Sequence, residues 1–472
     1  MMVGISLFAT LLSTLSYLAY PGETIRHGLM ILAVVAALPL VGLVVGWFLI
    51  PHIMRLRVTT ACEILESRFH VSVRLLGSLM FLSLRILWMA SIIYVVTDKV
   101  LVPILGVDPI WSPYISTLLA VVALTSTAFG GLRAAVAIDV VQTAILFGGA
   151  ILTLIHITWR LGGVSAWYPA TWPSHWPPPV WGFAPGERMT FAGVVVSTVI
   201  WYVCTAGSDQ LAIQRYLATR DVRSARRVLI VSLIADTAVT LLLVLLGVVL
   251  LAFYTANPNA LPEGMSVVQD ADQIFAHYIV HGLPAGITGL VVAALFADAM
   301  STLSSGVNST GSVLAIDLVS RLRRRPLSEE AQLRLARWSS LTVGVIVVVL
   351  SLYISRAPGN IYEMTYRTVN LFVAPLFLLF FMAMFIPWAT SLGAWAAAIT
   401  GLSVAVTISF WEQFTSHPGI SFLWITPGAL VCGALVGCSI SLIPFSTRKE
   451  LAMKIADGPA ESPSADQHEA RR

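Results

Sequence analysis

Long apolar segments recur along almost the whole chain, and each is close to the length that an α-helix needs to cross a bilayer. A spanning helix requires about 20 consecutive, mostly apolar residues. Hydrophobic residues make up 57% of the 472 residues and charged residues only 11%, whereas soluble domains carry about 25% charged residues. The apolar runs are continuous, while the strands of a membrane barrel alternate. The sequence therefore predicts an all-α, polytopic membrane protein.

About twelve segments meet this length criterion. Their approximate limits are 3–20, 29–51, 72–104, 113–130, 133–159, 189–214, 226–254, 282–318, 334–355, 361–386, 391–411 and 421–444. The first segment lacks a basic start, so we interpret it as a retained span and not as a cleavable signal. The polar tail from about residue 446 is predicted to be disordered.

Lys and Arg concentrate in alternate loops, and this bias sets the orientation of a membrane protein. The cation-rich loops 52–71, 215–227 and 319–333 and the tail fall on one side, which should be the cytoplasm. The loop 160–188 is rich in Trp and Pro and suits the opposite face. We expect a multi-pass protein of the plasma (inner) membrane with both termini in the cytoplasm.

Ionisable residues inside apolar spans are costly and are therefore candidates for function. The sequence has five of them: Arg85, Asp139, Asp236, Asp298 and Arg367. An arginine can snorkel to the interface, which leaves a structural role open for Arg85 and Arg367. A short carboxylate cannot do so, and both Asp139 and Asp298 have hydroxyl neighbours.

Asp298 belongs to a polar stripe in the segment 282–318. On a helix, Ser301, Ser304 and Ser305 share one face, and Asp298 joins it three residues before Ser301 and four before Thr302. Hydroxyl, carboxylate and carbonyl oxygens suit a hard monovalent cation. Packing between helices through small polar residues is the alternative, but such packing needs no carboxylate.

Two apolar segments are interrupted by polar or helix-breaking residues. The first carries several hydroxyls before Pro21-Gly22, and the segment 189–214 is broken by TAGSDQ at 205–210. Broken helices in corresponding positions of two repeats mark the binding sites of many transporters. Spans 1–5 and 6–10 would then be the two repeats, with spans 11 and 12 appended.

Five segments resemble motifs of the sodium:solute symporter family. They are GISLFATLLS (4–13), GGLRAAVAIDVVQTAILFGG (130–149), DQLAIQRYLATRDVRSARR (209–227), AMSTLSSGVNSTGSVLAIDL (299–318) and APLFLLFFMAMFIPWAT (374–390). The resemblance covers roughly residues 1–410. It implies a LeuT-type fold of two inverted five-helix repeats and sodium-coupled solute import by alternating access.

The resemblance also divides the chain into segments with different roles. These are a first inverted repeat (1–160), an extracellular loop (161–188), a second inverted repeat (189–387), the appended spans 11 and 12 (388–445) and a cytoplasmic tail (446–472).

The resemblance implies sodium as the coupling ion and no organic cofactor. The first sodium site would comprise the carbonyls of Ala9, Leu12 and Asp298 and the hydroxyls of Ser301 and Thr302. A second sodium site would comprise Asp139, Ser301, Ser304 and Ser305. The family usually has a small residue at position 298. The carboxylate of Asp298 would either strengthen sodium binding or take up protons as the coupling ion. A proton-coupled symporter of the same fold is therefore an alternative.

The substrate is less well defined than the ion. Sugar-transporting members carry a Tyr-Trp pair and a Lys where this chain has Thr205-Ala206 and Asp236, which disfavours a sugar. The resemblance favours a small organic anion or vitamin-like solute, which Arg367 would hold if it faces the cavity. Asp236 instead favours a cationic or zwitterionic solute. The candidate substrate-binding residues are Ser13, Ser16, Tyr17, Tyr202, Thr205, Asp236 and Arg367.

Other classes of protein are less consistent with the sequence. The nine histidines contain no HExxH motif, and no cluster of catalytic groups stands out, so we expect no enzyme activity. The tail is too short for a signalling domain, although a non-transporting solute sensor that acts through a partner is an alternative. We expect the solute and the lipid bilayer as partners, no nucleic acid, and a functional monomer.

Overall fold

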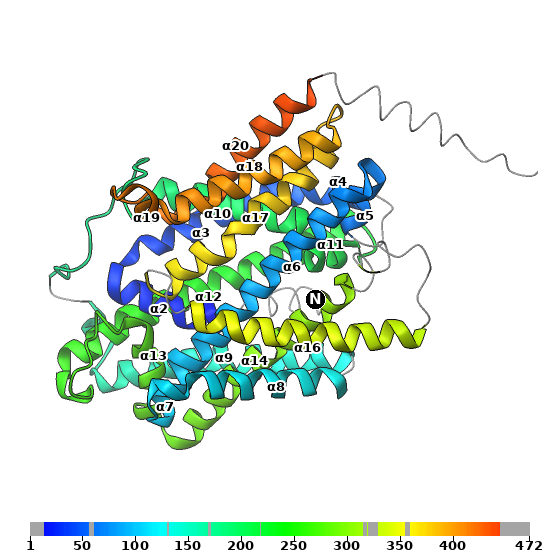
Figure 1. Cartoon of the computed structure of the whole chain (residues 1–472). Helices are drawn as coiled ribbons and strands as arrows, with labels where there is room; N and C mark the ends of the chain where they lie inside the picture. Colours follow the sequence, from blue (N-terminus) through cyan, green and yellow to red (C-terminus); the bar gives the residue numbers. More distant parts are fainter. Residues whose placement is uncertain are drawn as a thin grey trace, which may run out of the picture.

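The structure is a computed structural model that describes residues 14–55, 61–129, 132–168, 171–217, 219–314, 319, 329–354 and 359–443. Every regular element of these residues is helical (Figure 1). The longer elements are α2 (Thr14–His27), α3 (Ala33–Val44), α6 (Val71–Tyr94), α8 (Ser112–Phe129), α9 (Leu132–Arg160), α10 (Phe191–Ser208), α12 (Val222–Ala256), α14 (Ala285–Val313), α16 (Glu329–Ile354), α17 (Ile361–Phe385), α18 (Ser391–Ser409) and α20 (Ile425–Ser441). Shorter helices are α4 (Ile50–Arg55), α5 (Ala61–Arg68), α7 (Val102–Leu105), α11 (Gln210–Leu217), α13 (Ala271–His281) and α19 (Trp411–Thr415).

Among the described residues, 9 helices or continuous runs of helix are long and apolar enough to cross a membrane. Two shorter apolar helices, Pro109–Ala123 and Trp338–Ile354, coincide with further predicted spans. The first predicted span, 3–20, falls largely on residues outside the described part. The predicted all-α, polytopic class is confirmed.

The helix α2 continues through Pro21 and Gly22 to His27, although the sequence analysis placed the end of the first span at residue 20. Close packing on α12 accompanies this extension. A Cβ atom added to Gly247 would lie 2.7 Å from the Cβ of Thr24 and 2.8 Å from the carbonyl oxygen of Pro21. Glycine at position 247 therefore lets α12 pack directly on the backbone of α2.

The predicted interruption in the segment 189–214 is a real break. Helix α10 ends at Ser208, Asp209 has extended backbone angles (φ −74°, ψ 121°), and α11 begins at Gln210. A Cβ at Gly207 would lie 2.3 Å from the ring of Phe377, so glycine allows α17 to approach α10 just before the break.

Polar side chains fix the starts of several helices by accepting hydrogen bonds from otherwise unpaired backbone N–H groups. Thr190 accepts from Gly193 N at 3.0 Å, and Thr390 accepts from Gly393 N at 3.1 Å. Asp221 accepts from Ser224 N at 2.7 Å at the start of α12. These caps define where the spans begin on either side of the connecting loops.

Two C-terminal helices, α18 and α20, pack side by side against α17 (Figure 1). Small residues recur every four positions on both: Gly393, Ala397 and Gly401 on α18, and Ala429, Gly433, Gly437 and Ser441 on α20. Such spacing lets membrane helices approach closely enough for backbone contact. Helices α8, α9, α14 and α16 form another packed group, on the opposite side of the structure in this view.

Candidate functional site

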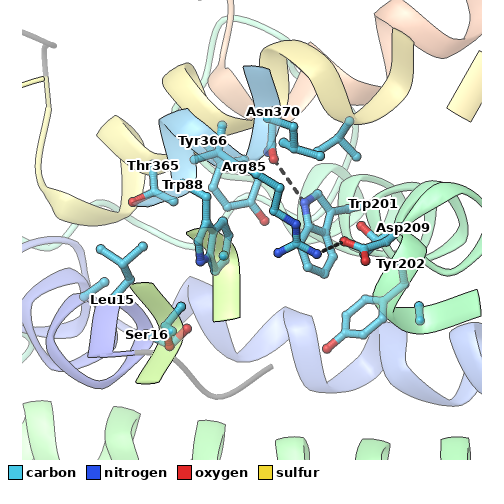
Figure 2. A pocket seen from close by; sticks show the side chains of 18 of the residues that line it. Leu15, Ser16, Arg85, Trp88, Trp201, Tyr202, Asp209, Thr365, Tyr366 and Asn370 are labelled. Atoms are coloured by element: carbon cyan, nitrogen blue, oxygen red, sulfur yellow. Dashed lines mark hydrogen bonds and ion pairs between the residues drawn. The ribbon is translucent and has the colours of Figure 1, made fainter. Parts of the chain in front are cut away.

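A cavity of about 220 Å³ lies in the middle of the helices, with walls from α2, α3, α6, α10, α11, α12, α14 and α17. The charged side chains that line it are Arg85, Asp209, Arg215, Asp236 and Asp298. The other walls are mainly aromatic, hydroxyl-bearing and aliphatic (Figure 2). A mostly apolar cavity with a few convergent polar groups is the usual form of a small-molecule site.

The break between α10 and α11 brings a carboxylate into the cavity wall. Asp209 Oδ2 lies 2.5 Å from Nη2 of Arg85, which projects from the long helix α6 (Figure 2). The Nε atom of Arg85 is buried and has no hydrogen-bond partner among the described residues. Arg85 therefore lines the cavity, forms an ion pair and retains one buried donor without a partner among the described residues.

A second polar region lies where α2 meets α14. Asp298 is 6% exposed, and its Oδ2 accepts hydrogen bonds from the backbone N of Thr14 at 2.9 Å and from the hydroxyl of Thr14 at 2.7 Å. Ser301, Thr302 and Ser305 line the same cavity. The polar stripe expected from helical spacing thus faces the cavity, and its carboxylate connects the two helices.

The two predicted sodium sites fall only partly within the described residues. Ala9 and Leu12 lie outside them, and so does the side chain of Asp139, whose backbone belongs to α9. Ser304 lies on α14 but does not belong to the cavity wall. The hydroxyl of Ser305 donates to the carbonyl oxygen of Thr302 at 3.0 Å.

Four of the predicted substrate-binding residues line the cavity: Ser16, Tyr202, Thr205 and Asp236. The hydroxyl of Tyr202 donates a hydrogen bond to Oδ2 of Asp236. Ser13 lies outside the described residues.

Tyr17 and Arg367 lie away from the cavity wall. The buried hydroxyl of Tyr17 donates to the carbonyl oxygen of Leu146 at 3.0 Å. Arg367 is 8% exposed and lies 2.8 Å from a carboxylate oxygen of Glu363, and its Nη1 donates to the carbonyl oxygen of Ser409 at 2.6 Å. Its guanidinium is therefore committed to a structural contact between α17 and α18.

Arg85 and Asp209 are not among the predicted sodium-binding or substrate-binding residues. In the sequence, Arg85 stands out as an intramembrane charge and Asp209 as part of the helix interruption. Two opposite charges within apolar segments are a signal for an intramembrane pair. The residues Trp88, Trp201, Tyr366 and Asn370 also line the cavity, and Trp201 Nε1 donates to Asn370 Oδ1 at 3.0 Å (Figure 2).

At one end of the helices, a buried ionic network joins α2 to α17. Glu23, which is 1% exposed, accepts hydrogen bonds from both terminal nitrogens of Arg188 and from the side-chain amide of Asn360. Arg188 also lies 3.3 Å from Glu363. Asp272 of α13 accepts from Ile361 N at 3.1 Å, so the first turn of α17 is tied to α2 and α13.

A polytopic helical protein in which a broken helix and a polar stripe meet at a central cavity has the organisation of a secondary transporter. The chain belongs to the sodium:solute symporter family, whose model matches residues 1–401. Its LeuT-type fold class, predicted from the sequence motifs, is confirmed.

Similar proteins support the same classification. The chain is 26% identical to the sodium/sialic acid symporter SiaT of Proteus mirabilis, over 95% of this chain and 88% of the relative. It is 28% identical to the sodium-coupled monocarboxylate transporter 1 of Xenopus laevis, over 93% of this chain and 69% of the relative.

Solved structures agree with these relationships. A Na⁺-coupled sialic acid symporter in its substrate-bound, outward-open state matches with a TM-score of 0.75 and 25% identity, over 93% of this chain and 89% of the other. Mhp1, a nucleobase-cation-symport-1 family transporter, shares the fold with a TM-score of 0.50 at 9% identity, over 93% of this chain and 91% of the other. The protein is a sodium-coupled solute symporter of the membrane, and not an enzyme.

Proposed function

We propose that the solute imported with sodium is a small organic molecule that carries a carboxylate, and that Arg85 binds this carboxylate. The observation that carries the proposal is the place of Arg85 in the cavity wall, with one buried donor, Nε, that has no partner among the described residues. Arginine presents several donors in one plane and binds carboxylates with two parallel hydrogen bonds. Arg215 also lines the cavity, but it lies on α11 beside the cation-rich loop 215–227, whereas Arg85 projects from a spanning helix.

The relatives favour this class of solute. Their names specify sialic acid and monocarboxylates, both of which are carboxylates. A plain sugar is disfavoured. Sugar-transporting members of the family carry a Tyr-Trp pair where this chain has Thr205-Ala206, and a Lys where it has Asp236.

The coupling ion would bind between α2 and α14. Asp298, Ser301 and Thr302 would contribute from α14, with the carbonyls of Ala9 and Leu12 completing the site. A second sodium would use Asp139 with Ser301, Ser304 and Ser305. Support comes from the cavity-facing stripe of α14 and from the hydrogen bonds between Asp298 and Thr14.

Coupling follows from this position. A cation held by the α14 stripe would stabilise α2 next to Ser16, a residue of the solute cavity. Each ligand would then raise the affinity for the other, as thermodynamic linkage requires. Inward movement of one charge across 100 mV contributes about 2.3 kcal/mol, and the sodium gradient adds to it.

The proposal extends to the cellular location, topology and oligomeric state of the protein. We expect the plasma (inner) membrane of the cell, cytoplasmic termini, surrounding bilayer lipid, a functional monomer and no organic cofactor. The two inverted repeats would span 1–160 and 189–387, followed by the appended segment 388–445.

The decisive experiment is uptake into proteoliposomes that contain the purified full chain, with sodium or choline outside. Wild-type protein should accumulate a carboxylate solute only with an inward sodium gradient, and Arg85→Gln should lower its apparent affinity about 30-fold or more. Leu79→Gln, an exposed position on the same helix, is the matched control and should retain uptake. Normal carboxylate affinity in Arg85→Gln would contradict the role of Arg85.

A proton-coupled symporter is the second candidate, because Asp298 places a carboxylate in the cavity wall. Uptake that follows a pH gradient and ignores sodium would favour it. Solute binding without transport would instead indicate a sensor.

A further inference from the structure

Asp236 is a carboxylate of the cavity wall that the proposed functions of Arg85 and of the α14 stripe leave unexplained. It lies in the middle of α12, within the candidate span Val222–Ala256. Its Oδ2 accepts the hydroxyl hydrogen of Tyr202, and no Lys, Arg or His of the described residues forms an ion pair with it. Its carboxylate is thus hydrogen-bonded to a neutral donor.

Two other carboxylates of the central helices, those of Asp209 and Glu363, have cationic partners. Asp209 pairs with Arg85 at 2.5 Å, and Glu363 pairs with Arg367 at 2.8 Å. A charge removed from water is expensive unless it is paired and hydrogen-bonded. A positively charged group beside Asp236, in the wall of the proposed solute cavity, would therefore be stabilised.

The aromatic side chains of the cavity indicate which cation fits. The rings of Tyr20 and Tyr362 have centroids 6.0 Å apart, and those of Tyr362 and Tyr366 are 4.9 Å apart. Trp201 packs on Tyr202 with centroids 5.1 Å apart. All five line the cavity with Asp236. Aromatic faces attract organic ammonium groups through cation–π interactions, and such walls are the usual recognition site for alkylated amines.

We infer that the solute is a zwitterion, with its carboxylate on Arg85 and its ammonium group on Asp236 among these aromatic rings. The inference rests on the proposed function, since it adds a second recognition group to the same solute. The two charged side chains come from different helices, α6 and α12, so the solute itself would bridge them.

A bare sodium ion suits the Asp236 position less well than an ammonium group does. Hard cations require several oxygen ligands, as the hydroxyl-rich stripe of α14 offers. At Asp236, the hydroxyl of Tyr202 already donates its hydrogen to the carboxylate, and the cavity wall that holds both residues is rich in aromatic rings.

The test compares matched compounds on the purified full chain, in saturating sodium and in choline. The first panel contains the proteinogenic amino acids, β-alanine, glycine betaine, and the plain carboxylates acetate, propionate and pyruvate, each assayed by thermal shift. Each amino acid that stabilises the protein is then compared with its N-acetyl derivative, which loses the ammonium charge, and with its methyl ester, which loses the carboxylate. Glycine betaine has no N–H to acetylate, so its uncharged carbon isostere 3,3-dimethylbutanoate takes the place of the N-acetyl derivative.

We expect sodium-dependent stabilisation by one or more zwitterions, and dissociation constants roughly 30-fold or more higher for the N-acetyl derivative and for the ester. In Asp236→Asn, the zwitterion should no longer bind more tightly than its N-acetyl derivative. Asp236→Glu, which restores the charge, should recover part of this difference in affinity. A sodium-induced thermal shift in the absence of solute shows that each variant is folded.

The outcomes separate the two levels of the argument. Suppose that plain or N-acetylated carboxylates bind as tightly as zwitterions, with the same dissociation constants in Asp236→Asn. That result overturns the inference of a zwitterionic solute but leaves the proposed carboxylate symporter in place. If no zwitterion of the panel binds, the inference of a zwitterionic solute is overturned as well. If no carboxylate of any kind binds in a sodium-dependent manner, the proposed function itself fails.

Discussion

Arg188 Nη2 lies 3.0 Å from Glu23 Oε2, so an arginine from the loop before α10 neutralises a carboxylate that is 1% exposed near the end of α2. Removing one partner of a buried pair leaves an uncompensated charge, which costs about 3–5 kcal/mol. Arg188→Gln should therefore lower the unfolding temperature markedly, as measured by tryptophan fluorescence during heating.

The neighbouring exposed residue provides the control for this prediction. Glu187→Gln changes the same loop without touching the network and should leave the unfolding temperature nearly unchanged. The double variant Glu23→Gln/Arg188→Gln should recover part of the loss, because it removes both charges. Equal unfolding temperatures for Arg188→Gln and wild type would show that the pair contributes little.

The α14 stripe gives a prediction for the coupling ion. Alanine at both Ser301 and Thr302 removes two hydroxyl oxygens from the proposed first sodium site and should abolish sodium-stimulated uptake. The matched double variant Ser309→Ala/Thr310→Ala lies about two turns further along α14. There the two hydroxyls donate to the carbonyl oxygens of Gly306 and Val307 in the same helix. That control should keep its sodium dependence, and retained sodium dependence in the Ser301/Thr302 variant would rule out this site.

Glycine at the helix break is predicted to be required for packing. In Gly207→Ala, the new methyl group would lie 2.3 Å from the ring of Phe377, and overpacking of this kind costs about 1–3 kcal/mol. Gly289→Ala on α14 meets no atom within 4 Å and serves as the control. Thermal unfolding should show a lower transition for Gly207→Ala and an equal or higher one for Gly289→Ala. The reverse order would contradict the close approach of α10 and α17.

Features set by local spacing could be predicted from the sequence. Helical periodicity alone places Asp298 and Ser301 on one face, and that face lines the cavity. The interruption at Asp209 could be predicted as well, because polar residues and a glycine break an apolar run.

Features set by packing between distant segments could not be predicted. Arg85 and Asp209 are 124 residues apart, and only the fold brings them together. The face of α17 that lines the cavity depends on how α17 packs on α18. Arg367 donates to the carbonyl oxygen of Ser409 in α18, whereas Tyr366 lies in the cavity wall. The helix α13 lies between the predicted spans 226–254 and 282–318. Its burial comes from packing on α2, which the sequence of this connection does not show.

The helix α13 also carries a group that makes stability depend on pH. Nδ1 of His277 lies 3.0 Å from the hydroxyl of Tyr254 of α12, and the ring of His281 lies 4.5 Å from that of His277. Burial lowers the pKa of His277 from 6.5 to about 4, and the neighbouring His281 acts in the same direction. His277 is therefore neutral in the folded protein at pH values where the unfolded chain would bind a proton.

The sign of the effect follows from proton linkage. Between about pH 6.5 and pH 4, the unfolded state binds more protons at this position, so stability falls as the pH is lowered through that window. His277→Gln should make the unfolding temperature fall less between pH 7 and pH 4.5 than it does in the wild type. Part of the slope should remain, because burial lowers the pKa of His27 in the same direction. The exposed His417→Gln should follow the wild-type curve, and a His277→Gln curve parallel to the wild type would exclude His277 as a source of the acid sensitivity.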